Sequence, residues 1–333
     1  MADSRVYQWG GIGFGDNETL LLAKALKQLS VSTAAQNVRL WGKIQGTKRD
    51  FYIAEGQSDA GVTEEEKPPG FEARGTGVNK YVYWATNSPL EAWSQLPDLT
   101  PSDIQAAREI KVHFTGSLDN KIITNPFFFK MESFYLRAQI ARIAFSTTLV
   151  PKGLYRTLED NEKEIEDNNP AEGAIVIPST ISMSNAEMWV HHTQNILKNN
   201  RVAHQEQGDG DDAADIMKKI EAADPYEKRL KTIGLDRKVK GQLPSWNVRL
   251  CGDRDQYGTP KSVNEKVNFG VVVVRSLQWP GATTFFTQGR WLQIYVGDGL
   301  KYEQKSFYPI FPPVIKEDPV DRPCYPEVSL LQS

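Results

Sequence analysis

Four consecutive valines at positions 271–274 constrain the fold of this 333-residue chain most strongly. β-Branched side chains favour strands, and successive side chains on a strand point to opposite faces of the sheet. A strand that is apolar on both faces must be covered on both faces, so we expect packed structure on either side of the sheet here. Further strands are predicted at residues 246–251, 268–279, 283–286 and 291–297.

The first half of the chain predicts one amphipathic helix followed by a hairpin. Leucines and alanines recur at helical spacing over residues 16–29, behind capping residues Asp16 and Asn17. Two β-branched and aromatic segments, 37–44 and 49–55, flank a four-residue loop and predict the hairpin. This hairpin could pair with strands in the last third of the chain, and residues 79–84 predict one more strand.

Three other segments carry helix or strand patterns. A capping box at Thr100 predicts a helix that runs to about residue 114, and another at Ser184 predicts a helix near 185–198. Residues 135–145 fit both helical spacing and strict alternation. Their β-branched continuation to Pro151 favours a long strand.

Polar segments separate these elements. Residues 56–77, 158–172 and 204–240 are rich in acids and glycine, which is typical of solvated loops, and the proline-rich tail from residue 308 predicts irregular structure. We therefore expect an α+β fold, mostly antiparallel β-sheet with three or four helices and long irregular polar loops. The chain is one region, 1–333, with possible halves 1–203 and 241–333 joined by the polar segment 204–240.

Composition excludes several classes of protein. The net charge is −3, from 39 basic and 42 acidic residues, so we expect neither nucleic acid nor an anionic membrane as a partner. The chain has no apolar run of the ~20 residues that a membrane helix needs, and its first residues predict no secretory signal. Only two cysteines occur, Cys251 and Cys324, and we interpret both as free thiols in a reducing compartment.

No catalytic or cofactor motif is complete. The glycine-rich turn at residues 10–15 precedes a helix, where phosphate often binds, but Asp16 occupies the position of the third glycine of the dinucleotide fingerprint. A nucleotide-binding enzyme that uses this turn is one alternative, and a tight packing turn is the other. Adjacent His191 and His192, on the predicted helix, diverge too far to share a metal readily. The acidic run from Asp209 lacks the glycine and closing acid of a calcium loop. We therefore predict no enzyme activity, no cofactor and no metal.

Aromatic residues are abundant, with eight tryptophans and twelve tyrosines. They concentrate in protein cores and at interfaces, so these side chains indicate either sheet core or an extended contact surface.

Many of these aromatic segments resemble the radial spoke head proteins of types 4 and 6, from motile cilia and flagella. The resemblance covers most of the chain in collinear order. Its segments lie at residues 8–15, 40–44, 52–56, 75–84, 93–97, 135–143, 189–192, 246–250, 274–281 and 294–299.

The resemblance implies a non-catalytic structural subunit of the radial spoke head in the axoneme, part of the cytoskeleton of the cytoplasm. Such a subunit passes mechanical signals between the central pair apparatus and the dynein arms. The implied partners are a second copy or a paralog of the 4/6 type, the type 9 protein, MORN-repeat head subunits, other head and stalk proteins, and central pair projections. A β-rich adaptor outside cilia remains an alternative. The interface candidates are Trp41, Tyr83, Trp84, His191, His192, Trp279, Glu159, Glu162, Glu164 and Glu166.

Overall fold

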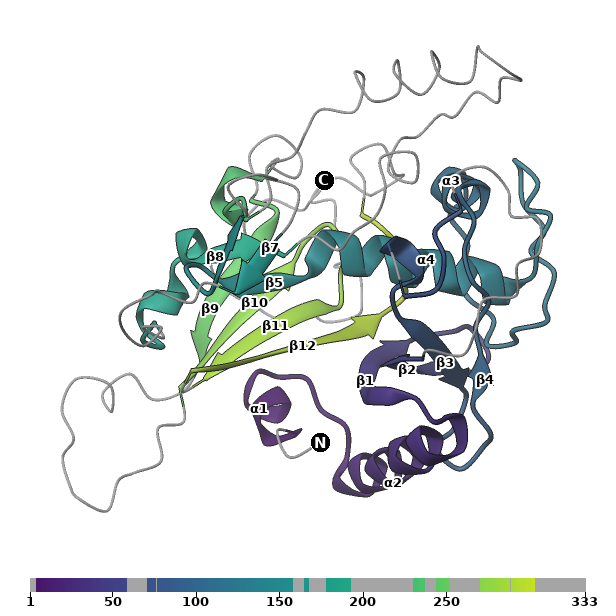
Figure 1. Ribbon diagram of the computed structural model, residues 1–333, viewed down its shortest axis with the longest axis horizontal. Helices are drawn as coiled ribbons and strands as arrows, with labels where there is room; N and C mark the ends of the chain where they lie inside the picture. Colours follow the sequence, from purple (N-terminus) through teal and green to yellow (C-terminus); the bar gives the residue numbers. More distant parts are fainter. Residues whose placement is uncertain are drawn as a thin grey trace, which may run out of the picture.

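The computed structural model (Figure 1) describes residues 4–58, 71–75, 77–157, 165–167, 178–192, 230–236, 244–251, 270–287 and 289–302. One eight-stranded sheet forms its centre, with α4 on one face and α1 and α2 on the other (Figure 1). Its helices are α1 (Ser4–Trp9), α2 (Asp16–Thr33), α3 (Pro101–Glu109) and α4 (Glu132–Thr147). This arrangement confirms the expected α+β class with a mostly antiparallel sheet.

The sheet combines strands from both ends of the chain, in the order β4-β3-β2-β1-β12-β11-β10-β9. Its strands are β1 (Gln36–Ile44), β2 (Phe51–Gln57), β3 (Val82–Thr86), β4 (Ser94–Gln95), β9 (Trp246–Cys251), β10 (Val271–Ser276), β11 (Ala282–Thr287) and β12 (Arg290–Gly297). All neighbours are antiparallel except β1 and β12, which pair in parallel from Gly42 opposite Tyr295 to Ile44 opposite Gly297. The predicted hairpin therefore exists as β1 and β2, and it does pair with a strand from the last third.

Both faces of β10 are covered, as the four valines predicted. Val271 and Val273 pack with Phe14 and Leu22, on the side of α1 and α2. Val272 and Val274 pack on the opposite side, with Met183 and Trp189 among their neighbours. All four valines are at most 2% exposed. Burial of this much apolar surface on both faces stabilises the middle of the sheet.

The predicted strand over residues 135–145 is wrong, because this segment is the middle of α4. The alternation suggested one polar face, but Arg137 and Gln139 are buried like their apolar neighbours. The helix lies between the sheet and α3 and buries residues around nearly its whole circumference. Only the short continuation, β5 (Leu149–Pro151), is extended.

Other boundaries also differ from expectation. Residues 185–192 are not helical: a 3-10 turn at Ala186–Met188 leads into β8 (Trp189–His191), and residues 193–198 lie outside the described residues. Asn185 still caps this turn, because its side chain accepts a hydrogen bond from the Glu187 amide at 3.0 Å. The helix α3 ends at Glu109, earlier than predicted, and residues 4–9 form a further helix, α1.

Two short ribbons complete the described fold. β5 pairs with β8, and β6 (Tyr155–Thr157) pairs with β7 (Ile165–Asp167), both antiparallel. None of the helices described here is both long enough and apolar enough to span a membrane.

Candidate functional site

The four aromatic interface candidates lie inside the protein. Trp41 is 9% exposed, Tyr83 and Trp84 are 2% exposed, and Trp279 is 1% exposed. The Trp41 ring of β1 stacks on the Tyr295 ring of β12, and the ring centroids are 5.3 Å apart. Tyr295 pairs with Gly42, the residue that follows Trp41.

The sequence left open whether these aromatic residues form the core of the sheet or a contact surface. Their burial favours the core. Trp41, Tyr83 and Trp279 belong to the core cluster that joins the sheet to α4. Trp84 packs on the other face of the sheet, in the cluster that contains Leu26 and Leu29 of α2.

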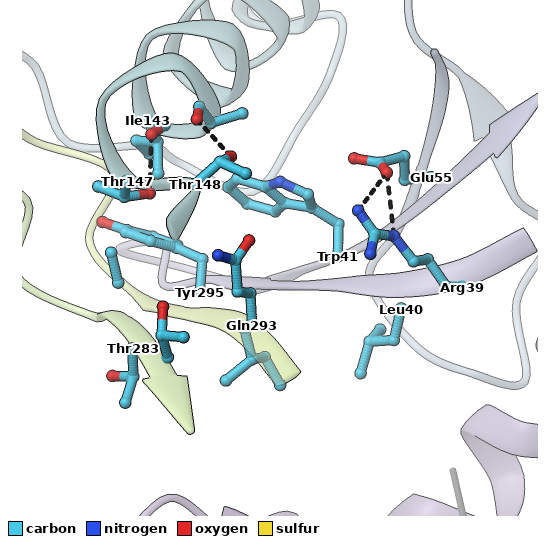
Figure 2. A pocket seen from close by; sticks show the side chains of 14 residues that line it. Arg39, Leu40, Trp41, Glu55, Ile143, Thr147, Thr148, Thr283, Gln293 and Tyr295 are labelled. Atoms are coloured by element: carbon cyan, nitrogen blue, oxygen red, sulfur yellow. Dashed lines mark hydrogen bonds and ion pairs between the residues drawn. The ribbon is translucent and has the colours of Figure 1, made fainter. Parts of the chain in front are cut away.

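A small cavity lies where β1 and β12 meet beneath α4 (Figure 2). Its volume is about 40 Å³, and its lining includes Trp41, Tyr295, Gln293 and Thr148. This space accommodates about one water molecule, whereas pockets for organic ligands typically measure about 300–1,000 Å³. The cavity therefore cannot hold a nucleotide or a comparable substrate.

Beside this cavity, the buried carboxylate of Glu55 on β2 binds the Arg39 side chain of β1 (Figure 2) and the Tyr83 side chain of β3. Glu55 accepts hydrogen bonds from Arg39 at 2.7 and 3.0 Å and from the Tyr83 hydroxyl at 2.8 Å. Arg137 of α4 stacks on the Tyr83 ring at 4.4 Å and donates to the carbonyl of Val78 at 2.7 Å. This network ties α4 to the sheet.

Burial governs the titration of this network. It raises the pKa of Tyr83 well above its ordinary value, with the negative charge of Glu55 adding to the effect. It lowers the pKa of Arg137. Both shifts disfavour the charged forms, as expected for groups removed from water. The buried phenol and the carboxylate with its two hydrogen-bonding partners stabilise the contact between neighbouring strands.

The glycine-rich turn packs against the sheet. A side chain at Gly10 would lie 2.0 Å from the Phe285 ring, so only glycine fits there without displacement. The carbonyl of Gly10 accepts a hydrogen bond from Arg275 at 2.8 Å. Asp16 and Glu18 occupy the first turn of α2, where their charges oppose a bound phosphate. The packing alternative therefore describes this turn best.

The two histidines lie at the end of β8, on a strand and the residue after it, not on a helix. The His191 Nε2 atom lies 2.7 Å from the Asp236 Oδ2 atom, and the Trp246 indole N–H donates to the same oxygen. Burial would raise the pKa of Asp236, but these hydrogen bonds and the nearby Lys231 lower it. His192 instead contacts the Tyr155 ring at 4.9 Å. Within the described ranges, no three potential ligands cluster to hold a metal ion.

Three of the acidic candidates, Glu159, Glu162 and Glu164, lie outside the described residues. Glu166 lies on β7, opposite Arg156 of β6. Contact of these acids with another protein stays a prediction.

Among the described residues, the two most exposed large apolar side chains, Ile123 and Phe129, lie on the loop that joins α3 to α4, and the sequence reasoning missed this loop. Ile123 is 91% exposed, Phe129 88%, Phe127 58% and Met131 43%. The rings of Phe127 and Phe129 contact each other edge to face at 4.7 Å, while Phe128 between them is buried. The run of three phenylalanines after Pro126 was the available signal.

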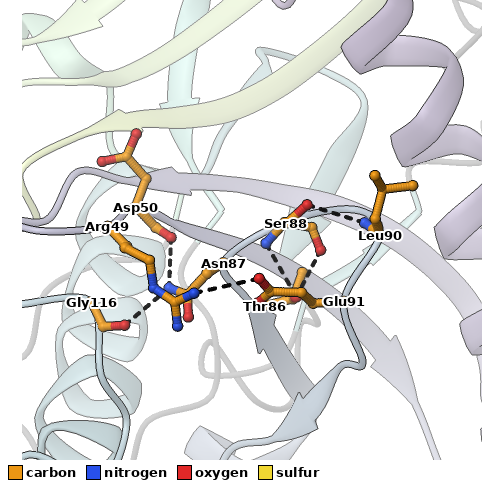
Figure 3. A network of polar contacts seen from close by, with 8 residues as sticks. All are labelled: Arg49, Asp50, Thr86, Asn87, Ser88, Leu90, Glu91 and Gly116. Carbon is orange, nitrogen blue, oxygen red and sulfur yellow. Dashed lines mark hydrogen bonds and ion pairs between the residues drawn. The ribbon is translucent and has the colours of Figure 1, made fainter.

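Polar contacts hold the start of this loop on the sheet (Figure 3). The Asn87 side chain donates to the carbonyls of Asp50, at 2.9 Å, and Gly116, at 3.0 Å. Gly116 has a φ of +95°, and a side chain there would lie 2.2 Å from the Arg49 carbonyl. Glycine is therefore required where the chain passes the loop between β1 and β2.

The sequence matches the family described as radial spokehead-like protein over residues 1–71 and 62–328. It is 32% identical to the human radial spoke head protein 4 homolog A over 99% of this chain, and 31% identical to the mouse radial spoke head protein 6 homolog A over 97%. It is 27% identical to the flagellar radial spoke protein 4 of Chlamydomonas reinhardtii over 92% of this chain. The chain spans about half the length of the human and mouse proteins, 50% and 52%, and 67% of the algal protein.

Proposed function

Because the chain belongs to the radial spokehead-like protein family, we propose that it is a non-catalytic structural subunit of the radial spoke head. The observation that carries this proposal is the family match, which includes every strand of the eight-stranded sheet. The burial of the aromatic residues supports the proposal, since an extensive aromatic core suits a scaffold.

The proposed location is the axoneme of motile cilia or flagella, within the cytoskeleton of the cytoplasm. There the subunit would help to relay mechanical signals between the central pair apparatus and the dynein arms. Its proposed partners are a second copy or a paralog of the 4/6 type, the type 9 protein, MORN-repeat subunits of the head, other spoke proteins and central pair projections.

Fractionation of cilia tests this role. Cilia are isolated and stripped of membrane with detergent, and mass spectrometry then follows the protein through extraction with chaotropic salt. We expect it to stay with the axoneme and to leave together with other spoke subunits. Its appearance in the detergent-soluble fraction, or its absence from cilia, would contradict the proposal.

We further propose that the acids Glu159, Glu162, Glu164 and Glu166 contact or repel central pair projections. Replacing all four with glutamine should alter beating in rescued cells without lowering the melting temperature of the protein. The matched control is Glu109→Gln, which neutralises an exposed acid at the end of α3. Normal motility of cells that carry the fourfold variant would refute this contact.

A further inference from the structure

The two edges of the eight-stranded sheet differ in length and regularity (Figure 1). One edge is β4, which is two residues long, whereas the other is β9, which pairs with β10 over six consecutive residues without a register shift. Natural sheets usually protect an edge by a very short strand, a bulge, proline or lysine. The strand β9 contains no proline and no bulge, and its one charged residue is Arg249. It therefore keeps the geometry of a strand that can accept a further strand.

The ladder between β9 and β10 shows which backbone groups of β9 point outward. The Leu277 amide donates to the Ser245 carbonyl at 2.8 Å, so these opposite residues form a hydrogen-bonded pair just beyond the two strands. Bonded and non-bonded pairs alternate along an antiparallel ladder, so Val248 and Leu250 do not bond to β10. Their amides and carbonyls point away from the sheet. Among the described residues, no hydrogen bond reaches these four groups.

The side chains of β9 define what an added strand must carry. Val248 and Leu250 are half-buried on the face of the sheet that packs against Met183 and Trp189. Arg249 projects from the opposite face, is exposed and forms no ion pair with any described residue. Residues directly opposite each other on neighbouring strands share a face and interact. An added strand therefore fits when it places apolar residues opposite Val248 and Leu250 and an acid opposite Arg249.

We propose that the outer edge of β9 binds an extended segment of another protein, in which apolar residues alternate with acidic ones. The segment adds a ninth strand to the sheet, hydrogen-bonds to Val248 and Leu250, and pairs an acid with Arg249. In this mode of recognition the main chain supplies affinity, and the side chains at alternate positions supply specificity. The inference goes beyond the proposed structural role, because it assigns one surface of the chain to one class of partner.

Fluorescence anisotropy with the purified full chain and labelled peptides tests the site. The probe has the sequence Ser-Thr-Val-Glu-Ile-Thr-Ser. In antiparallel pairing its valine and isoleucine lie opposite Leu250 and Val248, and its glutamate lies opposite Arg249. Methylation of the valine and isoleucine nitrogens removes the two donors that face β9 and should weaken binding by at least about tenfold. Methylation of the glutamate nitrogen, which faces away from β9, is the matched control and should leave binding unchanged.

Charge reversal tests the ion pair. Arg249→Glu should weaken binding of the probe by about tenfold, because an attraction across the strands becomes a repulsion. A peptide with lysine in place of the glutamate should bind this variant more tightly than it binds the wild type. Arg249 is exposed, so the variant should keep the wild-type melting temperature. The control Lys24→Glu reverses an exposed charge on α2 and should leave the binding of both peptides unchanged.

Amide hydrogen exchange followed by NMR shows whether the edge is open. The amides of Val248 and Leu250 should exchange quickly in the free chain and slowly with the probe bound, whereas the Arg249 amide, which bonds to β10, should be slow in both. Protection of the two outward amides in the free chain would overturn the proposal, because the edge is then already covered by the chain itself or by a second copy. Equal binding of the probe and its doubly methylated form, or no saturable binding up to about 1 mM peptide, would also overturn it. These measurements use the purified chain, so their outcome is independent of the fractionation of cilia.

Discussion

Replacing Glu132 with alanine should destabilise the protein through two backbone amides. The carboxylate is 1% exposed and accepts hydrogen bonds from the Thr115 amide at 2.8 Å, the Gly116 amide at 3.0 Å and the Thr115 hydroxyl at 2.7 Å. A buried donor that loses its acceptor costs about 1–3 kcal/mol. Two amides without an acceptor therefore lower the free energy of unfolding by about 2–6 kcal/mol. We expect a loss of roughly 3 kcal/mol, because the loop can partly relax.

Urea denaturation followed by circular dichroism measures this loss. With a slope of about 3 kcal/mol per molar urea, the midpoint should fall by about 1 M. Hydrogen-exchange mass spectrometry should also show faster exchange in the peptide that contains residues 115 and 116. The control Glu109→Ala removes an exposed acid and should change stability by less than about 0.5 kcal/mol. If Glu132→Ala unfolds at the midpoint of this control, the carboxylate does not hold the loop.

Three further predictions concern the joints of the fold. Gly42→Ala should lower the free energy of unfolding by about 3 kcal/mol or more, because its Cβ would lie 2.1 Å from the Tyr295 carbonyl oxygen and force β1 away from β12; a thermal melt like that of the wild type would contradict this. Burial would raise the pKa of Asp236, but hydrogen bonding to His191 helps to hold it below its ordinary value. The ionised Asp236 therefore stabilises the folded protein above about pH 4, and this stabilisation is lost as the pH falls through the lowered pKa. Asp236→Asn should therefore be less stable than the wild type at neutral pH and should approach it in thermal melts near pH 3, and a pH-independent difference would refute the linkage. Burial raises the pKa of Tyr83, so the stability that it contributes is complete below about pH 10 and declines above that pH, where the unfolded chain ionises. Tyr83→Phe should make the alkaline decline in urea stability shallower, and an unchanged slope would exclude this tyrosine as its source.

Local sequence patterns were sufficient to predict the segments whose structure depends on residues close to one another in the chain. The helix at α2 and the β1–β2 hairpin follow from helical spacing and from alternation around a short loop. The four valines of β10 predicted cover on both faces, because no other arrangement removes all four from water. The incomplete glycine motif at residues 10–15 likewise pointed to packing as one of two alternatives.

Long-range contacts decided the segment that the sequence misassigned. Arg137 and Gln139 suggested a solvent-facing side of a strand, but in α4 both are buried. Gln139 donates to the carbonyl of Gly299, 160 positions along the chain, and Arg137 to that of Val78, 59 positions back. These partners lie outside residues 135–145, so no pattern within the segment could reveal them. Alternation therefore could not distinguish polar side chains that face solvent from buried polar side chains that have hydrogen-bond partners.

The sequence alone therefore determined the family, the class of fold and the type of those elements whose apolar residues recur at a regular spacing within one segment. Tertiary structure decided which aromatic residues are core and which are surface. Trp41 and Trp279 are buried where the halves of the sheet meet α4, whereas Phe127 and Phe129 are exposed because their loop is tied down through Phe128 and Glu132. The physical reason is that hydrophobicity drives a side chain out of water without specifying its partner, and only the packed chain decides whether that partner is its own core or another molecule.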